Sequence, residues 1–493
     1  MGRISTVLNG KLIGRILSYI LLITSLSMLL SLAVSLFYRE TETALMFLII
    51  IAVLSAISIA GILFFKPIRT TLRVRDGFLV VTLSWFLMSL AGALPFWFSG
   101  SFPTFIDAFF ESASGFTTTG STILSDVESL TKGVQFWRTF THWLGGMGIL
   151  VFVVALLPSL GVGGLQLIQA EAPGPTTDKL ASKLTDTAKI LYTIYLVFTA
   201  VETVLLLLGG MDWFDALTHS FATMGTGGFG NYNNSIAAFD SPYIQWVITL
   251  FMMLAGTRFT LYYLLLRRKF KEVAGDSEMK VYWLIWGAVT VLLTVILLKE
   301  NVVPSLEEAL RLSGFQTASL LTTTGFATAD FDLWPAAAKM LLFLLYFIGG
   351  CAGSTGGGIK VIRLISYFKF IKRGLYLRLH PNAVVPVKIG GKPLSQESVS
   401  SISTFLFFYM FLILLGTAVV AFDGQDLVTA LSASLACLGN VGPGFNLVGP
   451  ACNFGFLSGF TKTFLAFLMI VGRLELFTVL TIFMPSFWNP NKY

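Results

Sequence analysis

Four short glycine-containing segments place the strongest constraint on this chain, because they recur at intervals of about a hundred residues. Each segment lies in a stretch that is too short to cross a bilayer, between longer apolar runs. The recurrence predicts one structural unit that is used four times, and four such units can surround a single pore. The segments are Thr118-Thr119-Gly120, Gly225-Thr226-Gly227, Thr323-Thr324-Gly325 and Asn440-Val441-Gly442.

The composition is that of a polytopic membrane protein. Of its 493 residues, 55% are hydrophobic and only 12% are charged, which is about half the charged share of a soluble domain. We predict ten membrane spans, each of which needs about 20 apolar residues, and an even number places both termini in the cytoplasm. The spans lie near residues 17–37, 44–65, 77–98, 138–158, 188–209, 243–266, 281–298, 338–362, 401–422 and 463–485.

The basic residues behind the net charge of +7 indicate the topology in the membrane, because they gather in loops between apolar runs. By the positive-inside rule, the loops after the second, sixth and eighth runs face the cytoplasm. We therefore expect a multi-pass protein of the cytoplasmic (inner) membrane, with the lipid bilayer as its surroundings and no nucleic-acid partner. The residues that mark these loops are Lys66, Arg69, Arg73 and Arg75, then Arg267, Arg268, Lys269 and Lys271, then the stretch 360–392.

The predicted fold is all-α. Each unit reads as a helix, a re-entrant pore helix with a filter turn, and a second helix, and the four pseudo-repeats surround one pore. We predict an N-terminal transmembrane helix pair at 1–76 and pore repeats at 77–187, 188–280, 281–400 and 401–493.

An acidic residue opens each predicted pore helix. A carboxylate there is stabilised by the helix dipole by about 0.3–1 kcal/mol, and the partially negative end then points inward and favours a cation. Ordinary helix capping explains any one acid alone, whereas the fourfold recurrence favours the pore. The residues are Asp107, Asp215, Glu308 and Asp426.

The turns themselves are suited to holding a dehydrated cation. Unwound backbone at membrane depth survives only where it is buried or lines water, and converging carbonyls replace the water around an ion. Glycine gives the backbone the freedom to turn those carbonyls inward. Close helix packing explains a single glycine motif equally well, but not four in matching places. The candidate filter comprises Thr118, Thr119, Gly120, Ser121, Gly225, Thr226, Gly227, Thr323, Thr324, Gly325, Asn440, Val441 and Gly442.

The chain resembles the Trk/Ktr/HKT superfamily of potassium transporters, and within it the TrkH-type subunits. The motifs that carry the resemblance are SGFTTTGST at 114–122, TMGTGGFG at 223–230, LLTTTGFAT at 320–328, LGNVGPGF at 438–445, GGCAGSTGGGIKVIR at 349–363 and HPNAVVPVKIGGKPL at 380–394.

The resemblance implies selectivity-filter glycines at Gly120, Gly227, Gly325 and Gly442. It implies potassium at Thr119, Gly120, Thr226, Gly227, Thr324, Gly325, Val441 and Gly442. A serine at the first glycine goes with sodium permeation in some plant members, so Gly120 favours potassium and rubidium. The resemblance also implies a homodimer and a cytoplasmic TrkA-like regulatory subunit that binds a nucleotide, NAD(H) or ATP/ADP.

The eighth span carries a glycine-rich stretch, for which the family resemblance implies the role of an intramembrane gate. Each glycine costs a helix about 1 kcal/mol relative to alanine, so the middle of the span opens into a loop across the pore. A phosphate-binding loop is disfavoured because no lysine directly follows the last glycine. A glycine-rich packing face is the plain alternative. The candidate gate comprises Gly349, Gly350, Gly353, Ser354, Gly356, Gly357, Gly358 and Arg473.

Two arginines within membrane spans are costly enough to point to function. Arg473 is expected to contact carbonyls of the loop at 349–358 and to raise an electrostatic barrier below the filter; the alternative is an ion pair with Glu475 or Glu202. For Arg258 two interpretations stay open: an effect on gating or subunit contacts, or a pair with Glu202.

The leading function is gated, selective uptake of potassium and rubidium, without enzymatic activity and with no cofactor on this chain beyond the potassium ion. The alternative is a secondary transporter for another cation or small solute, coupled to sodium or protons. We disfavour it because the four units run in the same direction and no buried Asp or Glu is expected beside the turns.

Overall fold

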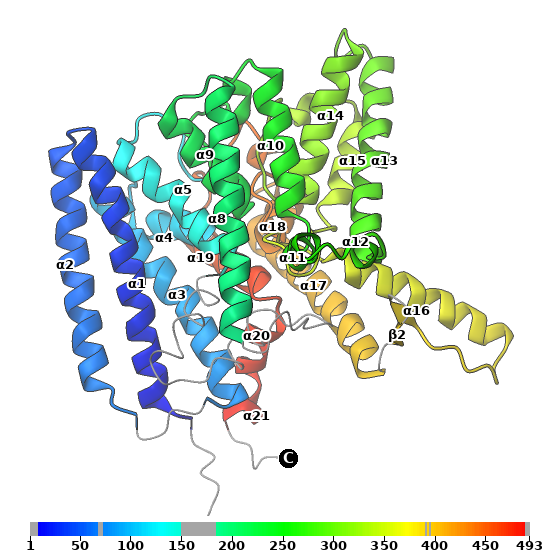
Figure 1. Ribbon diagram of the computed structural model, residues 1–493, viewed down its shortest axis with the longest axis horizontal. Helices are drawn as coiled ribbons and strands as arrows, with labels where there is room; N and C mark the ends of the chain where they lie inside the picture. The colour runs from blue at the N-terminus through cyan, green and yellow to red at the C-terminus, as the bar shows by residue number, and fades with distance from the viewer. Residues whose placement is uncertain (1–7, 68–71, 149–183, 390–391, 394–395, 489–493) are drawn as a thin grey trace, which may run out of the picture.

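The computed structural model describes residues 8–67, 72–148, 184–389, 392–393 and 396–488. Helices dominate this part of the chain (Figure 1). Its one sheet joins the two-residue strands β1 (Lys388–Ile389) and β2 (Lys392–Pro393). The expected all-α membrane fold is confirmed.

The N-terminal pair is α1 (Gly10–Phe37) and α2 (Thr41–Phe64), which pack along each other at one edge of the molecule (Figure 1). The inner face of α1 packs on α3 and α5. The outer face of α2 leaves large apolar side chains exposed, among them Leu45, Leu48 and Ile49. Such a face is stable only in an apolar solvent, which is the lipid.

The four predicted units are present in order. The first two contain α3 (Val74–Phe98), α4 (Phe105–Phe116) and α5 (Lys132–Gly146), then α8 (Leu184–Leu208), α9 (Trp213–Gly225), η2 (Ser235–Ala238), α10 (Pro242–Ala255), α11 (Phe259–Leu266) and α12 (Phe270–Ala274). The last two contain α13 (Ser277–Lys299), α14 (Leu306–Leu321), η3 (Phe331–Leu333), α15 (Ala336–Leu345) and α16 (Val361–Leu379), then α17 (Gln396–Phe422), α18 (Leu427–Gly439), η4 (Asn446–Val448), α19 (Gly459–Arg473), α20 (Phe477–Leu480), η5 (Thr481–Phe483) and α21 (Pro485–Trp488).

Several predicted spans are not straight helices. Within the described residues, six single helices are long and apolar enough to cross a membrane, and they match the first, second, third, fifth, seventh and ninth spans. The sixth bends by 93° between α10 and α11, and the tenth by 110° after α19. The eighth stops at Leu345 and resumes at Val361. The second half of the fourth span, 149–158, lies outside the described residues.

Candidate functional site

The four pore helices are α4, α9, α14 and α18, and each begins with a side-chain cap. Thr104, Asp212 and Ser305 accept backbone N–H groups at the start of the first three. Asp426 does so for the fourth, so this predicted acid is the cap itself. The other predicted acids lie in the first turns of their helices. The caps thus provide acceptors for backbone N–H groups at the start of each pore helix. The opposite, partially negative ends of the helices lead directly into the four turns.

All four turns share one backbone conformation. A residue with left-handed geometry follows each helix, the next residue donates its N–H back into the helix at 2.8–2.9 Å, and a glycine with positive φ comes after it. The left-handed residues are Thr118, Thr226, Thr323 and Asn440, with φ from 53° to 59°. The glycines are Gly120, Gly228, Gly325 and Gly442, with φ from 79° to 102°.

This equivalence corrects the predicted register of the second turn. Gly228 (φ 79°), and not Gly227, occupies the position of the other three glycines. Gly227 is equivalent to Thr119, since its N–H donates to Ala222 O as that of Thr119 donates to Ser114 O. The sequence has adjacent glycines here, and both are free to adopt positive φ. Residue type alone therefore could not decide which one does.

The turns meet in a closed ring. A Cβ atom added to the positive-φ glycine of any turn would fall against a carbonyl oxygen of the next turn. The order of contacts runs from the first repeat through the second, third and fourth and back to the first. The pairs are Gly120 with Gly227 O, Gly228 with Thr324 O, Gly325 with Val441 O, and Gly442 with Thr119 O. Only glycine fits at these four positions, because the four segments pack backbone against backbone in a closed ring.

Side chains tie neighbouring turns together. Asn440 Nδ2 donates to Thr119 Oγ1 and to Met469 O, both at 2.9 Å. Ser121 Oγ donates to Gly442 O at 2.8 Å. The contacts of Asn440 with Thr119 and of Ser121 with Gly442 join the fourth repeat to the first. These repeats are the two ends of the ring in chain order.

His142 supports the second turn from behind, a role the sequence did not reveal. Its Nδ1 lies 2.8 Å from Gly115 O. Its ring lies where a Cβ of Gly227 would be, and its carbonyl where a Cβ of Gly225 would be. A lone histidine in an apolar helix gave no signal of this, because the contact joins residues that are far apart in the chain.

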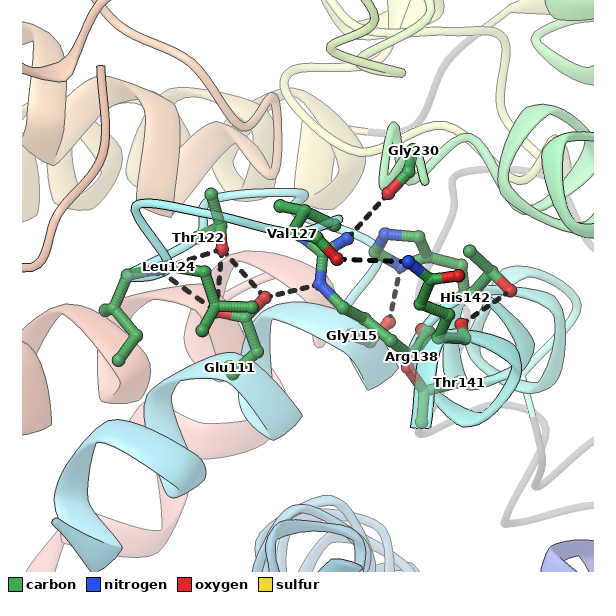
Figure 2. Close-up of polar contacts among 12 residues, drawn as sticks. Glu111, Gly115, Thr122, Leu124, Val127, Arg138, Thr141, His142 and Gly230 are labelled. Atoms are coloured by element: carbon green, nitrogen blue, oxygen red, sulfur yellow. Dashed lines mark hydrogen bonds and ion pairs between the residues drawn. The ribbon is translucent and has the colours of Figure 1, made fainter. Parts of the chain in front are cut away.

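A buried ion pair joins the segments that leave the first and second turns (Figure 2). The Glu111 carboxylate accepts from Thr122 Oγ1 at 2.9 Å, from Ile123 N at 3.1 Å and from Arg138 Nε at 2.6 Å. Arg138 Nη1 donates to Gly230 O at 3.0 Å. Both side chains are almost fully buried. The expectation that no buried acid lies beside the turns is therefore wrong.

A cavity of about 190 Å³ lies over the ring. Its lining includes the positive-φ glycine of every turn, but no residue of the loop at 349–358. Asp126 lies at its rim, where Asn233, a lining residue, donates to its carboxylate at 3.0 Å. This hydrogen bond lowers the pKa of Asp126, so the rim keeps a negative charge at neutral pH.

The glycine-rich stretch of the eighth span is non-helical, as predicted, and lies against the turns. Gly357 N donates to Thr323 Oγ1 at 2.6 Å, and a Cβ at Gly357 would lie 2.6 Å from Gly439 O. Gly349 N donates to Ile359 O at 2.8 Å and closes the base of the loop. Two of the glycines, Gly353 and Gly358, have positive φ. The other predicted gate residues of this span, Gly350, Ser354 and Gly356, lie within the same loop.

Arg473 makes the expected contact with the loop. Its Nη1 donates to Thr355 O at 2.7 Å, and its Nη2 donates to the carbonyls of Gly145 and Gly146 at 2.7 Å. The guanidinium therefore joins the loop to the end of α5 in the first repeat. Glu475, one of the alternative partners, forms an ion pair with Arg363.

Arg258 does not pair with Glu202, so that alternative is wrong. Its Nη2 lies 3.1 Å from Glu278 Oε2 and its Nη1 3.7 Å from Asp276 Oδ2. Glu202 is buried on α8, and its carboxylate oxygens have no hydrogen-bond partner among the described residues. Sequence reasoning missed Glu278 because this acid lies at the start of a span, where a carboxylate is normally read as a helix cap.

Comparison with known proteins agrees with this geometry. The family model TrkH, described as a cation transport protein, matches residues 45–489. "Trk system potassium uptake protein TrkH" of Escherichia coli (strain K12) is 39% identical over 98% of this chain and 100% of its own length. "Trk system potassium uptake protein TrkG" of the same strain is 35% identical over 97% and 99%.

Among solved structures, the crystal structure of the potassium transporter TrkH from Vibrio parahaemolyticus superposes with a TM-score of 0.87. It is 35% identical and covers 98% of this chain and 100% of its own. The match extends over all four repeats and the loop, and the chain therefore belongs to the TrkH family of cation transport proteins.

Proposed function

We propose that this protein mediates selective uptake of potassium, with rubidium as an accompanying substrate, through the pore that its four turns enclose. The observation that carries the proposal is the closed ring, in which the positive-φ glycine of each turn adjoins a carbonyl of the next. Carbonyls that converge on one axis replace the hydration shell of a potassium ion. The pore-helix ends add a negative potential at the same place.

The corrected register also sets the proposed potassium ligands. We assign the second turn's contribution to Gly227 and Gly228 in place of Thr226 and Gly227, because these are equivalent to the pairs in the other turns. The ligands are then the backbone carbonyls of Thr119 and Gly120, Gly227 and Gly228, Thr324 and Gly325, and Val441 and Gly442.

We further propose that the loop at 349–358 and Arg473 form the gate. The loop contacts the third and fourth turns, and Arg473 places a positive charge beside it. A fixed positive charge next to the pathway raises the energy of a passing cation. Release of the loop together with Arg473 is the proposed opening step.

We place the protein in the cytoplasmic membrane as a homodimer, with both termini in the cytoplasm and a TrkA-like nucleotide-binding subunit on the cytoplasmic face. The relatives' names, which speak of a Trk system, support an assembly of more than one component. The basic helix α16 extends away from the body on the side of the cytoplasmic loops (Figure 1). It offers a surface on which the regulatory subunit can dock.

The test is ion flux into liposomes that contain the purified protein alone. Potassium and rubidium flux well above sodium and lithium, down an imposed gradient and without a second ion, is the expected result. Flux that requires a sodium or proton gradient would favour the coupled transporter instead. Equal flux of all four ions would contradict the filter.

A further inference from the structure

The gate loop is anchored on a second side, away from the turns. There it lies against the break between α10 and α11. Cys351 N donates to Gly256 O at 2.9 Å, Thr355 N donates to Ala255 O at 3.3 Å, and Phe259 N donates to Gly353 O at 3.1 Å. A 93° bend leaves backbone groups without helical partners, and the loop supplies partners for them. The bend in the second repeat and the loop in the third are therefore one structural unit.

A carboxylate from α13 closes this unit. Glu278 Oε1 accepts from Ala352 N at 2.8 Å, inside the loop, and from Ile362 N at 3.0 Å, just after it. One buried carboxylate oxygen thus joins a residue of the loop to the start of α16. The other carboxylate oxygen, Oε2, accepts a hydrogen bond from Arg258 Nη2 at 3.1 Å.

Arg258 completes the arrangement from the bend. Its Nε donates to Ala352 O at 3.1 Å, so Ala352 is held by both members of the ion pair. Arg258 is the residue that precedes α11, and its conformation therefore depends on the bend itself. The Arg258 side chain is only 14% exposed and the Glu278 side chain 2%. A buried pair of this kind is costly to break one partner at a time.

We propose that Arg258 and Glu278 form a clasp that positions the gate loop and sets the balance between its restricting and its open arrangement. The inference rests on the proposed function of the loop as a gate. Arg258 and Glu278 act through their contacts with Ala352 and Ile362, so both are positioning residues. While the clasp is closed, Ala352 is fixed to the bend in α10–α11 and the loop stays beneath the ring. Opening of the gate then requires that the contacts of Arg258 and Glu278 with the loop break and are replaced by others.

The test uses graded variants in the full-length protein. Glu278→Gln keeps an oxygen that can accept the two N–H groups but removes the nearer of the two charges opposite Arg258, with Asp276 unchanged, whereas Glu278→Ala removes every contact of the Glu278 side chain. Arg258→Gln removes the charge from the other side, and Arg258→Lys retains it. The matched control is Glu272→Gln, which neutralises an exposed pair with Lys269.

The first readout is single-channel recording in planar bilayers. We expect open probability to rise by about tenfold in Glu278→Ala and by less in Glu278→Gln and Arg258→Gln, because only the part of the lost contact energy that differs between the two arrangements shifts their balance. Arg258→Lys keeps the charge but not the forked guanidinium, so it is expected to lie between the parent and Arg258→Gln. Unitary conductance and the potassium-to-sodium permeability ratio should not change, whereas general damage to the pore would alter both.

The second readout is the rate at which maleimide labels Cys351, measured by peptide mass spectrometry. This thiol belongs to the loop and is fully buried. We expect its labelling to quicken in Glu278→Ala and Glu278→Gln, and to stay unchanged in Glu272→Gln.

The two readouts separate the clasp from the gate. Faster labelling without a change in open probability would support the clasp and contradict the gating role of the loop. Unchanged labelling in Glu278→Gln, in protein that elutes as the parent does on gel filtration, would overturn the clasp whatever the flux. An altered permeability ratio without faster labelling would also overturn it.

Discussion

The filter turns and the gate loop are both non-helical backbone inside the membrane part of the protein, yet they are held in different ways. Each turn abuts the backbone of the next turn and is bonded to its own pore helix. The loop is held by backbone hydrogen bonds to the bend between α10 and α11 and by the side chains of Thr323, Arg473 and the clasp of Arg258 and Glu278. A filter set by backbone contacts cannot shift without strain, whereas a loop held by a few polar contacts can exchange them.

The largest expected effect is therefore from a side chain added to the ring. Gly325→Ala places a Cβ against Val441 O at a residue whose φ is 85°. Backbone strain and overlap together should lower rubidium flux by roughly a hundredfold. Gly287→Ala is the control, since a Cβ there meets nothing within 4 Å. Near-parental flux in folded Gly325→Ala protein would show that the ring is not the ion pathway.

The second largest effect is expected from removal of the positive charge of Arg473 beside the gate loop. Arg473→Ala removes the donor to Thr355 O and the positive charge near the pathway, so potassium flux should rise by about tenfold. Arg268→Ala, on an exposed part of a loop, is the control. Flux that falls or stays the same, with Arg473→Ala stably folded, would mean that this arginine does not restrict passage.

A smaller effect is expected where one side chain braces the filter. Ser121→Ala removes the hydrogen bond to Gly442 O, which is worth about 1 kcal/mol, and should lower the potassium-to-sodium permeability ratio by about fivefold. Ser112→Ala is closely matched, because Ser112 is also buried in the first repeat but its hydroxyl has no hydrogen-bond partner among the described residues. Equal ratios in the two variants would indicate that backbone contacts alone define selectivity.

The smallest effect concerns the rim of the cavity. Asp126→Asn removes an exposed charge at the rim, where the hydrogen bond from Asn233 lowers the pKa of the Asp126 carboxyl. Potassium influx should fall by about twofold at low ionic strength and recover at high salt, where exposed charges are screened. Since the lowered pKa keeps the carboxylate charged, the parent should show no change from this group around neutral pH. A loss that persists at high salt would point to a structural role.

Much of the fold followed from local patterns. The predicted repeat boundaries fall three to five residues inside the helices that begin at Val74, Leu184, Ser277 and Gln396. The non-helical stretch in the eighth span was predicted from its glycines alone. These features depend on apolar length and on backbone freedom, both of which are properties of residue type.

The candidate site was predicted less completely. The four turns were found, but the second was placed one residue early, since Gly227 and Gly228 are chemically identical. His142, Glu111 and Arg138 were missed as supports of the filter. For Arg258 the sequence left two interpretations open, one of them a pair with Glu202, and neither named Glu278, which lies beside it.

The sequence by itself determined the membrane environment, the four units, the positions of the turns and the loop, and the family. Only the tertiary structure decided the register of the second turn, the closure of the ring, and the partners of the buried charges. The physical reason is the distance along the chain over which each interaction acts. Apolar length and glycine content act on neighbouring residues, whereas an ion pair such as that of Arg258 and Glu278 depends on how a bend in one helix meets the start of another.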